Sequence, residues 1–173
     1  MIIKVDIIPL EQLKQAIINT EKNIMQDFRP FWEDYATPEV TEEIARIFAT
    51  EGYGQWPQLS PKYAQWKRKH YPGKKMLRLT DAYFKASTQK GAGGNIAHYT
   101  KDYMEWGADL SYFESIAGFP YPVVHEKPSE GGRHPKRAVY ELAEQSDALQ
   151  NSLVETFGKW LDKRVREELK KVF

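Results

Sequence analysis

The histidines of this chain can be tested directly for metal or acid–base chemistry. His125 is followed by Glu126, His134 lies beyond a Gly/Pro-rich stretch, and His98 falls in a predicted strand. No two histidines have the i, i+4 spacing that places two zinc ligands on one helix face, and no carboxylate cluster completes a site. We therefore expect no metal and no other cofactor, a His125 that makes a loop hydrogen bond, and exposed His98 and His134. A small hydrolase that uses His125 and a neighbouring acid stays open as a third alternative.

Serine and glycine motifs do not indicate catalysis either. Ser60, Ser87 and Ser111 all lie outside any G-x-S-x-G motif. The glycine-rich run 91–94 lacks the Lys-Ser/Thr continuation and the long helix of a phosphate-binding loop, so we interpret it as a flexible linker. We expect that the protein is not an enzyme.

One basic stretch is the best candidate for contact with nucleic acid. Residues 52–80 hold seven Lys or Arg and no acidic residue. Tyr63, Trp66 and Tyr71 are interleaved with these cations, and such rings stack on bases in nucleic-acid-binding proteins. We favour the alternative in which the rings face the core and the cations face water. The candidate nucleic-acid or subunit contacts are Lys62, Lys67, Arg68, Lys69, Lys74, Lys75 and Arg78.

The first half of the chain shows clear element signals. The β-branched run 2–8 predicts a strand, and apolar spacing predicts a helix over about 10–28 that Pro30 kinks or ends. Thr37-Pro38 is typical of a helix start with Thr37 as the cap, and the glycines of 52–54 are typical of the end of that helix.

Similar signals continue towards the middle of the chain. Ser60-Pro61 predicts the start of a helix that Tyr71-Pro72-Gly73 stops. Thr80 or Asp81 caps a short helix through Ser87, and residues 96–106 predict two short strands.

The last third divides into a proline-rich region and a helix. Residues 108–136 hold four prolines and three glycines, which predicts a long loop with a short edge strand over 121–124. Apolar residues recur every three or four positions over about 143–172, which predicts a helix of about 25 residues. The predicted fold is α+β, with helices packed on a small, mainly antiparallel sheet. Residues 1–142 form the α+β part, with 108–136 as an insertion, and 143–173 form a long C-terminal helix of the same domain.

Composition limits the class of protein further. The 173 residues, 41% of them hydrophobic, suit a single domain with a real core. Cysteine is absent, so disulfides and thiol nucleophiles are excluded, and the N-terminus is too short and too charged for a signal peptide. No window is apolar enough to span a membrane, and we expect no membrane partner.

Charge is unevenly distributed along the chain. The net charge is +1, but residues 1–51 hold five basic and ten acidic residues, a balance of −5, against +7 over 52–80. Residues 81–173 hold thirteen basic and fourteen acidic residues, a balance of −1. This polarity suits self-assembly, in which the acidic face of one copy meets the basic face of the next.

A series of spaced residues over about 40–142 forms motifs of a known family. These residues are Phe48, Gly52, Trp56, Leu59, Ser60, Tyr63, Lys67, Leu77, Thr80, Ser87, Trp106, Gly107, Tyr121, His125, Pro135 and Arg137. Together they resemble the phage virion-morphogenesis or tail-completion family, typified by a Mu-like tail completion protein. The chain departs from the family at Asp81, at Ala108 and in an insertion over 108–120.

We expect architectural roles for these motif residues. Trp56 and Leu59 would lock a helix corner, and Trp106 would be buried at a strand end where Gly107 allows a turn. Arg137 would meet a carboxylate, either within the domain or on a neighbouring subunit.

The resemblance implies a non-enzymatic α+β protein of a tailed phage or prophage. Members of this family act at the head–tail junction or the tail end, commonly as homo-oligomeric rings in contact with other head, neck or tail proteins. They are made in the bacterial host cytoplasm and become virion components. The alternative is a DNA-binding accessory protein that uses the basic helix 62–71.

Overall fold

The computed structural model describes residues 10–127 and 134–171, and within these it leaves the side chains of residues 10–14, 16 and 20 undescribed. The strand predicted over 2–8 and the last apolar residue of the predicted C-terminal stripe, Val172, lie outside the described residues.

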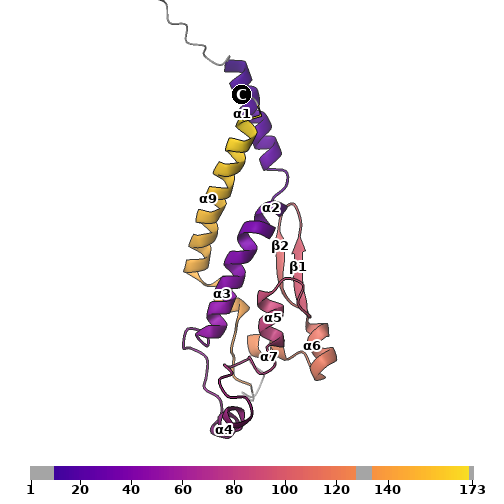
Figure 1. Ribbon diagram of the computed structural model, residues 1–173, viewed down its shortest axis with the longest axis vertical. Coiled ribbons are helices and arrows are strands. Elements are labelled where there is room, and N and C mark those ends of the chain that lie inside the picture. The colour runs from indigo at the N-terminus through magenta and orange to yellow at the C-terminus, as the bar shows by residue number, and fades with distance from the viewer. Residues whose placement is uncertain (1–9, 128–133, 172–173) are drawn as a thin grey trace, which may run out of the picture.

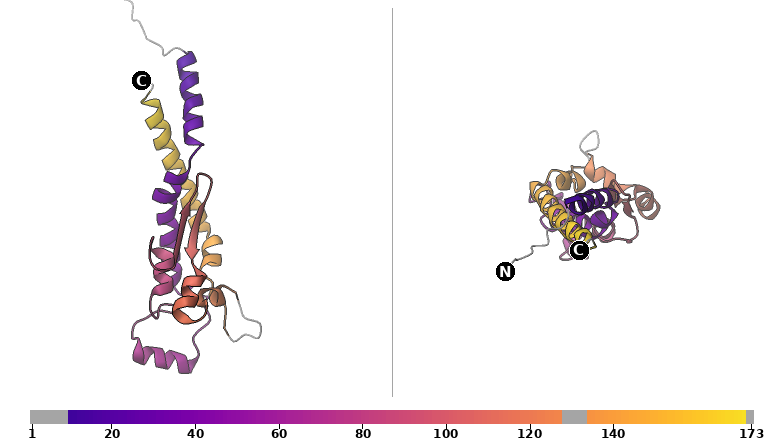
Figure 2. Two further views of the ribbon diagram at one scale, coloured as in Figure 1. Left: turned by 90° about the vertical axis from the view of Figure 1, so that its right-hand side faces the viewer. Right: turned by 90° about the horizontal axis from the view of Figure 1, so that it is seen from above.

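The fold is α+β, as the sequence predicts, with helices around a two-stranded antiparallel sheet and a long helix last in the chain. The molecule is elongated, with α1 and the end of α9 at one tip and α4 at the other (Figures 1 and 2). The elements are α1 (Leu10–Ile24), α2 (Arg29–Phe31), the π-helical η1 (Trp32–Ala36), α3 (Thr37–Ala49), α4 (Pro61–His70), α5 (Ala82–Thr88), β1 (Asn95–Tyr99), β2 (Met104–Ala108), α6 (Leu110–Ala117), α7 (Tyr121–Glu126), α8 (Tyr140–Glu144) and α9 (Asp147–Leu169).

The first helix is shorter than predicted and is not ended by proline. α1 stops at Ile24, well before Pro30. Pro30 lies instead in the first turn of α2, where its missing N–H costs no hydrogen bond. The prediction that Pro30 kinks or ends the first helix is therefore wrong. The Phe28 N–H donates to the carbonyl of Lys101 (3.0 Å), which ties the break after α1 to the tip of the hairpin.

α2, η1 and α3 continue as one helical rod, so α3 begins at Thr37 as predicted, but the prediction that Thr37 caps it is wrong. Thr37 has helical backbone angles (φ −58°, ψ −46°), and its hydroxyl donates to the carbonyl of Trp32 (2.8 Å). Pro38 lacks an N–H and its ring crowds the preceding helical turn. The wider π-helical turn directly before it, closed by the Thr37 N–H on the Trp32 carbonyl, accommodates that ring.

α3 ends in a left-handed turn, as the glycines after it predict. The Gly52 N–H donates to the carbonyl of Ile47 (2.8 Å) and the Glu51 N–H to that of Phe48 (3.4 Å), which is the bond pair of a Schellman turn. The first left-handed residue is Glu51 (φ 54°), where glycine is usual. The Glu51 carboxylate accepts the N–H of Met76 (2.9 Å), a contact that connects this turn to the segment after α4.

β1 and β2 form the hairpin that the sequence predicts, and α5 packs against it. The glycine-rich run 91–94, which precedes β1, is a turn packed against the ring of Tyr112. The interpretation of this run as a flexible linker is therefore wrong. A Cβ atom on Gly93 or Gly94 would lie 2.6 or 2.4 Å from an atom of the Tyr112 side chain. Glycine is needed here because the backbone approaches an aromatic ring closely.

The region 108–136 is not a long loop, because it contains α6 and α7. Asp109 caps α6 with its side chain, and Gly118 ends that helix with a positive φ (76°). Pro122 lies in the first turn of α7, so the edge strand predicted over 121–124 is also wrong. Glycine and proline here mark helix ends rather than irregular chain.

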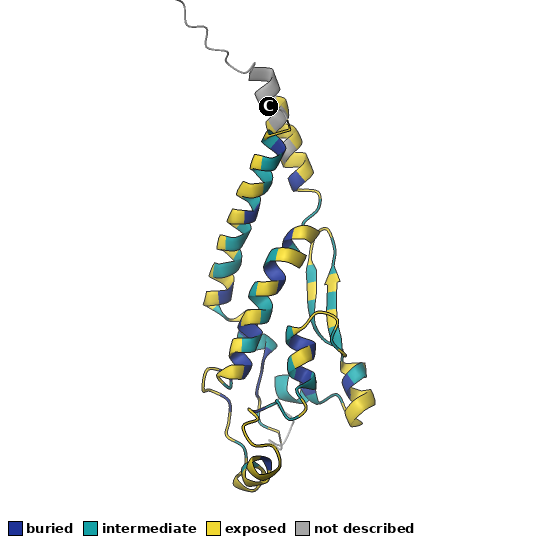
Figure 3. Ribbon diagram, viewed as in Figure 1, coloured by how far each residue is buried: buried dark blue, intermediate teal, exposed yellow. Residues whose placement is uncertain are grey.

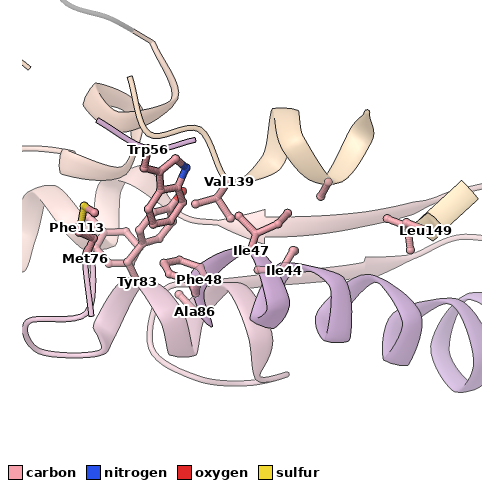
Figure 4. Close-up of a cluster of buried hydrophobic side chains, with 11 residues drawn as sticks. Ile44, Ile47, Phe48, Trp56, Met76, Tyr83, Ala86, Phe113, Val139 and Leu149 are labelled. Carbon is pink, nitrogen blue, oxygen red and sulfur yellow. The ribbon is translucent and has the colours of Figure 1, made fainter. Parts of the chain in front are cut away.

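Two clusters of buried side chains stabilise the molecule (Figure 3). The larger one joins α3, α5, α6 and α8 to the start of α9, and Figure 4 shows its side chains converging around Phe48 and Tyr83. The smaller one contains Ile24, Phe31, Ala36 and Trp160. The apolar stripe predicted for the C-terminal helix is confirmed within α9, which contributes side chains to both clusters.

Candidate functional site

Trp56 lies at the centre of the motif residues and is buried, as predicted. Only 4% of its surface is exposed, and its ring meets Phe48 edge to face at 6.0 Å. Its Nε1–H donates to the carbonyl of Ala138 (3.1 Å). A Cβ atom on Gly52 would lie 2.2 Å from the indole, so glycine is the residue that lets the ring close over the turn. Trp56 thus joins the end of α3 to the segment before α8.

Arg137 makes the reciprocal connection, and among the described residues its side chain binds carbonyls rather than the carboxylate predicted within the domain. Its Nε and Nη2 donate to the carbonyl of Pro57 (3.0 and 2.8 Å), and Nη2 also donates to that of Gln58 (3.3 Å). These carbonyls belong to a segment without regular structure and need donors when they are buried. Because Arg137 is itself buried, its pKa is lowered from the ordinary value.

The motif residues around α4 and the hairpin are structural. Ser60 caps α4 by accepting the Tyr63 N–H (3.4 Å), as predicted. The half-buried Trp106 donates from Nε1 to the carbonyl of Ser87 (2.8 Å). Gly107 lies inside β2 with open space at the Cβ position, so the turn predicted there is wrong.

The other motif residues also pack or cap. Leu59, Leu77 and Tyr121 are half-buried against the larger core cluster. The buried Ser87 hydroxyl shares a hydrogen bond with the Tyr140 hydroxyl (2.9 Å). Thr80 accepts the N–H of the first residue of α5 (3.3 Å), and Pro135 is half-buried.

The half-buried Glu126 joins α5, α7 and α8 through one carboxylate oxygen, and sequence reasoning missed this role. One oxygen of Glu126 accepts the Tyr83 hydroxyl (2.9 Å) and the N–H groups of Val139 (2.7 Å) and Tyr140 (3.2 Å). The carboxylate therefore caps α8 from a distant part of the chain, where the positive end of the helix favours an anion. Burial raises the pKa of Tyr140 to about 12 and that of Tyr83 well above its usual value. Because one carboxylate oxygen of Glu126 accepts three hydrogen bonds, Glu126 stabilises the fold.

His125 lies in the helix α7 rather than in a loop, and its carbonyl accepts the Arg137 N–H (2.8 Å). Its buried Nδ1 has no hydrogen-bond partner among the described residues. Burial, followed by the charges of Arg137 and His134, lowers the pKa of His125 to about 4. His98 and His134 are exposed, as expected, and His98 pairs with Glu105 (3.2 Å). Nothing in this arrangement supports the hydrolase alternative.

α4 has the opposite orientation to the one that the sequence favours. Tyr63, Trp66 and Tyr71 are 41%, 40% and 38% exposed, whereas Lys67 is only 5% exposed. The Lys67 ammonium donates to the carbonyl of Lys75 (2.5 Å), and burial lowers its pKa. Helical periodicity placed the aromatic residues on one face correctly, but that face points to solvent.

The candidate contact cations divide into three groups. Lys67 is buried, and Lys74 and Arg78 form ion pairs with Asp81. Those that are exposed and form no ion pair with a described residue are Lys62, Arg68, Lys69 and Lys75.

An apolar groove lies between α1 and α9 at the opposite tip of the molecule. Its volume is about 370 Å³, and Ile17 and Met25 are 56% and 58% exposed there. The other lining residues are Glu21, Ile24, Leu161, Val165 and Leu169.

Within residues 10–127 and 134–171, no three His, Cys, Asp or Glu side chains gather where they could hold a metal ion. No helix in the described part combines the length and apolarity that a bilayer crossing needs. Comparison with family models, with curated proteins and with solved structures found no match to this chain.

Proposed function

We propose that this protein is a non-enzymatic structural protein of phage or prophage virion assembly, which acts in tail completion or head–tail joining through self-association. One observation carries the proposal: the first and last motifs of the family resemblance contact each other. Trp56 donates to Ala138, and Arg137 donates to Pro57 across 80 residues of sequence. Residues that match a family in separate motifs and then pack together support a shared architecture rather than chance similarity.

The form of the molecule supports assembly by its two tips. The groove between α1 and α9 leaves apolar surface uncovered, which is typical of protein interfaces. The other tip carries the exposed cations around α4. Copies of such a rod can associate in a ring and still present a chemically distinct tip to head, neck or tail proteins. In this proposal the chain is made in the bacterial host cytoplasm and becomes part of the virion.

The test is electron microscopy of particles from the parent phage with this gene deleted. Separate tailless heads and free tails, or tails of abnormal length, are expected. A plasmid copy of the gene should restore normal particles, which controls for polar effects of the deletion. Normal infectious particles from the deletion strain would reject the proposal.

A further inference from the structure

α4 presents a row of aromatic rings to solvent. Tyr63 and Trp66 are nearly parallel (22°) with ring centres 5.5 Å apart, and His70 continues the row at 5.3 Å from Trp66. The ring of Tyr71 lies 5.5 Å from Trp66 and is tilted by 51° to it. These four neighbouring side chains are all exposed, and α4 lies at one tip of the molecule (Figure 2, left).

Hydrogen bonds order the backbone of the helix that carries these rings. Ser60 caps its first turn, and the Tyr71 N–H closes its end on the carbonyl of Lys67 (2.7 Å). The buried Lys67 side chain donates to the carbonyl of Lys75 (2.5 Å), which ties α4 to the segment after it. A ligand that stacks on the row would therefore meet rings on an ordered backbone, which lowers the entropy cost of binding.

The charge around the row is positive and largely uncompensated. No acidic residue occurs over 52–80. The two flanking acids are engaged elsewhere, since Glu51 accepts the Met76 N–H and Asp81 pairs with Lys74 and Arg78. Four exposed cations pair with no described acid and can therefore attract an anionic ligand to the rings. They are Lys62, Arg68, Lys69 and Lys75.

We propose that this α4 surface, made of the four rings and these four cations, binds single-stranded nucleic acid. Bases would stack on the row, and phosphates would lie against the cations, as in sequence-tolerant single-strand binders. A duplex offers no free base faces to the rings. Cores of protein interfaces are depleted of lysine, so a protein partner fits this mixed surface less well. The inference stands independently of the assembly role.

The test is fluorescence anisotropy of a labelled 20-nucleotide oligo-dT strand titrated with the full chain at 50 mM salt and above. We expect binding that weakens with salt, with a log–log slope of about −0.7 for each phosphate contacted. Trp66→Ala should weaken binding by about 5- to 100-fold, the range for loss of one stacking ring, while Trp66→Phe retains most of it. Trp66 lies outside both buried clusters, so its replacement should lower the melting temperature much less than Trp56→Ala does.

Charge variants separate local contact from general attraction. Lys69→Gln should reduce the salt slope, whereas the matched variant Lys170→Gln, at an exposed cation that follows α9 and forms no ion pair with a described residue, should not. No binding at 50 mM salt would overturn the inference. The inference would also be overturned if a duplex bound as tightly as the single strand and Trp66→Ala left that binding unchanged. Equal reductions of the salt slope in the two lysine variants would overturn it as well. A Trp66→Ala variant that alters oligomeric state but not strand binding would identify a protein interface instead.

Discussion

At the scale of single residues, the motif side chains act by joining backbone segments. Trp56 and Arg137 both donate to backbone carbonyls on the opposite side of one corner, and Glu126 accepts from the backbone of α8. A side chain that satisfies a buried backbone group replaces secondary structure where the chain has none. Replacement of such a residue therefore removes both packing and a hydrogen bond.

Trp56→Ala should lower the free energy of unfolding by about 3–5 kcal/mol, because it empties a packed site and leaves the Ala138 carbonyl without its donor. Chemical denaturation followed by circular dichroism measures the change. Trp56→Phe, which keeps most of the ring volume, should cost less. A melting temperature unchanged by Trp56→Ala would show that the corner is not a core contact.

His125 should make the fold sensitive to mild acid. Its pKa is lowered from 6.5 to about 4 in the folded state, so the unfolded chain binds a proton first as the pH falls. The neutral His125 ring stabilises the fold above pH 6.5, and this stabilisation is lost as the pH falls towards 4. The free energy of unfolding should fall by about 1–3 kcal/mol over this range, because the ring is partly exposed to solvent.

The readout is the difference in unfolding free energy between wild type and His125→Gln across this pH range. The variant cannot take up this proton, so its curve should be flatter than that of the wild type. Parallel curves would show that His125 does not titrate differently on folding.

At the scale of elements, stability should differ between the two ends of the rod. Each α1 side chain described between Gln15 and Asn23 is exposed, and α1 packs mainly on α9. α3 instead buries Ile44, Ile47 and Phe48 in the larger cluster. Segments with few buried contacts open more readily.

Hydrogen exchange should detect this difference directly. We expect the amides of residues 15–23 to exchange much faster than those of residues 44–48 under native conditions. Trp160 of α9 belongs to the smaller cluster together with Ile24 of α1, so its replacement tests whether the two helices open together. Trp160→Ala should speed exchange in α1 further while leaving residues 44–48 nearly unchanged. Equal protection of the two segments would contradict this division.

At the scale of the whole molecule, the exposed apolar groove predicts association between copies. Ile17→Lys should reduce the mass measured by light scattering at high protein concentration, because a charge replaces apolar surface in the groove. Ile17 is exposed in the single chain, so stability at low concentration should change little. Val154→Lys, on a 74% exposed α9 residue that does not line the groove, is the matched control. A constant mass for wild type and both variants would mean that the groove does not mediate association.

Local signals determined several of the helix ends correctly, although the one helix predicted over about 143–172 is divided into α8 and α9. The Ser60 cap, the glycines after α3, the hairpin and the stripe of α9 depend on interactions within a few residues, so they can be read from sequence. Pro30 shows where such reading fails. The sequence predicts that it kinks or ends the first helix, but it lies in the first turn of α2. Pro38 lies at the start of α3 as predicted, but a π-helical turn precedes it in a continuing rod, which no local signal indicates.

The sequence alone determined the fold class, the core position of Trp56 and the common face of Tyr63 and Trp66 on α4. Only the tertiary structure decided which face of α4 is covered, because periodicity defines a stripe without defining its neighbour. The same holds for the partners of Arg137, His125 and Glu126. The hydrogen-bond partners of Arg137 and Glu126 lie up to 80 residues away, and the buried Nδ1 of His125 has no partner in the described part of the chain. Only the folded arrangement of distant segments brings donor and acceptor together.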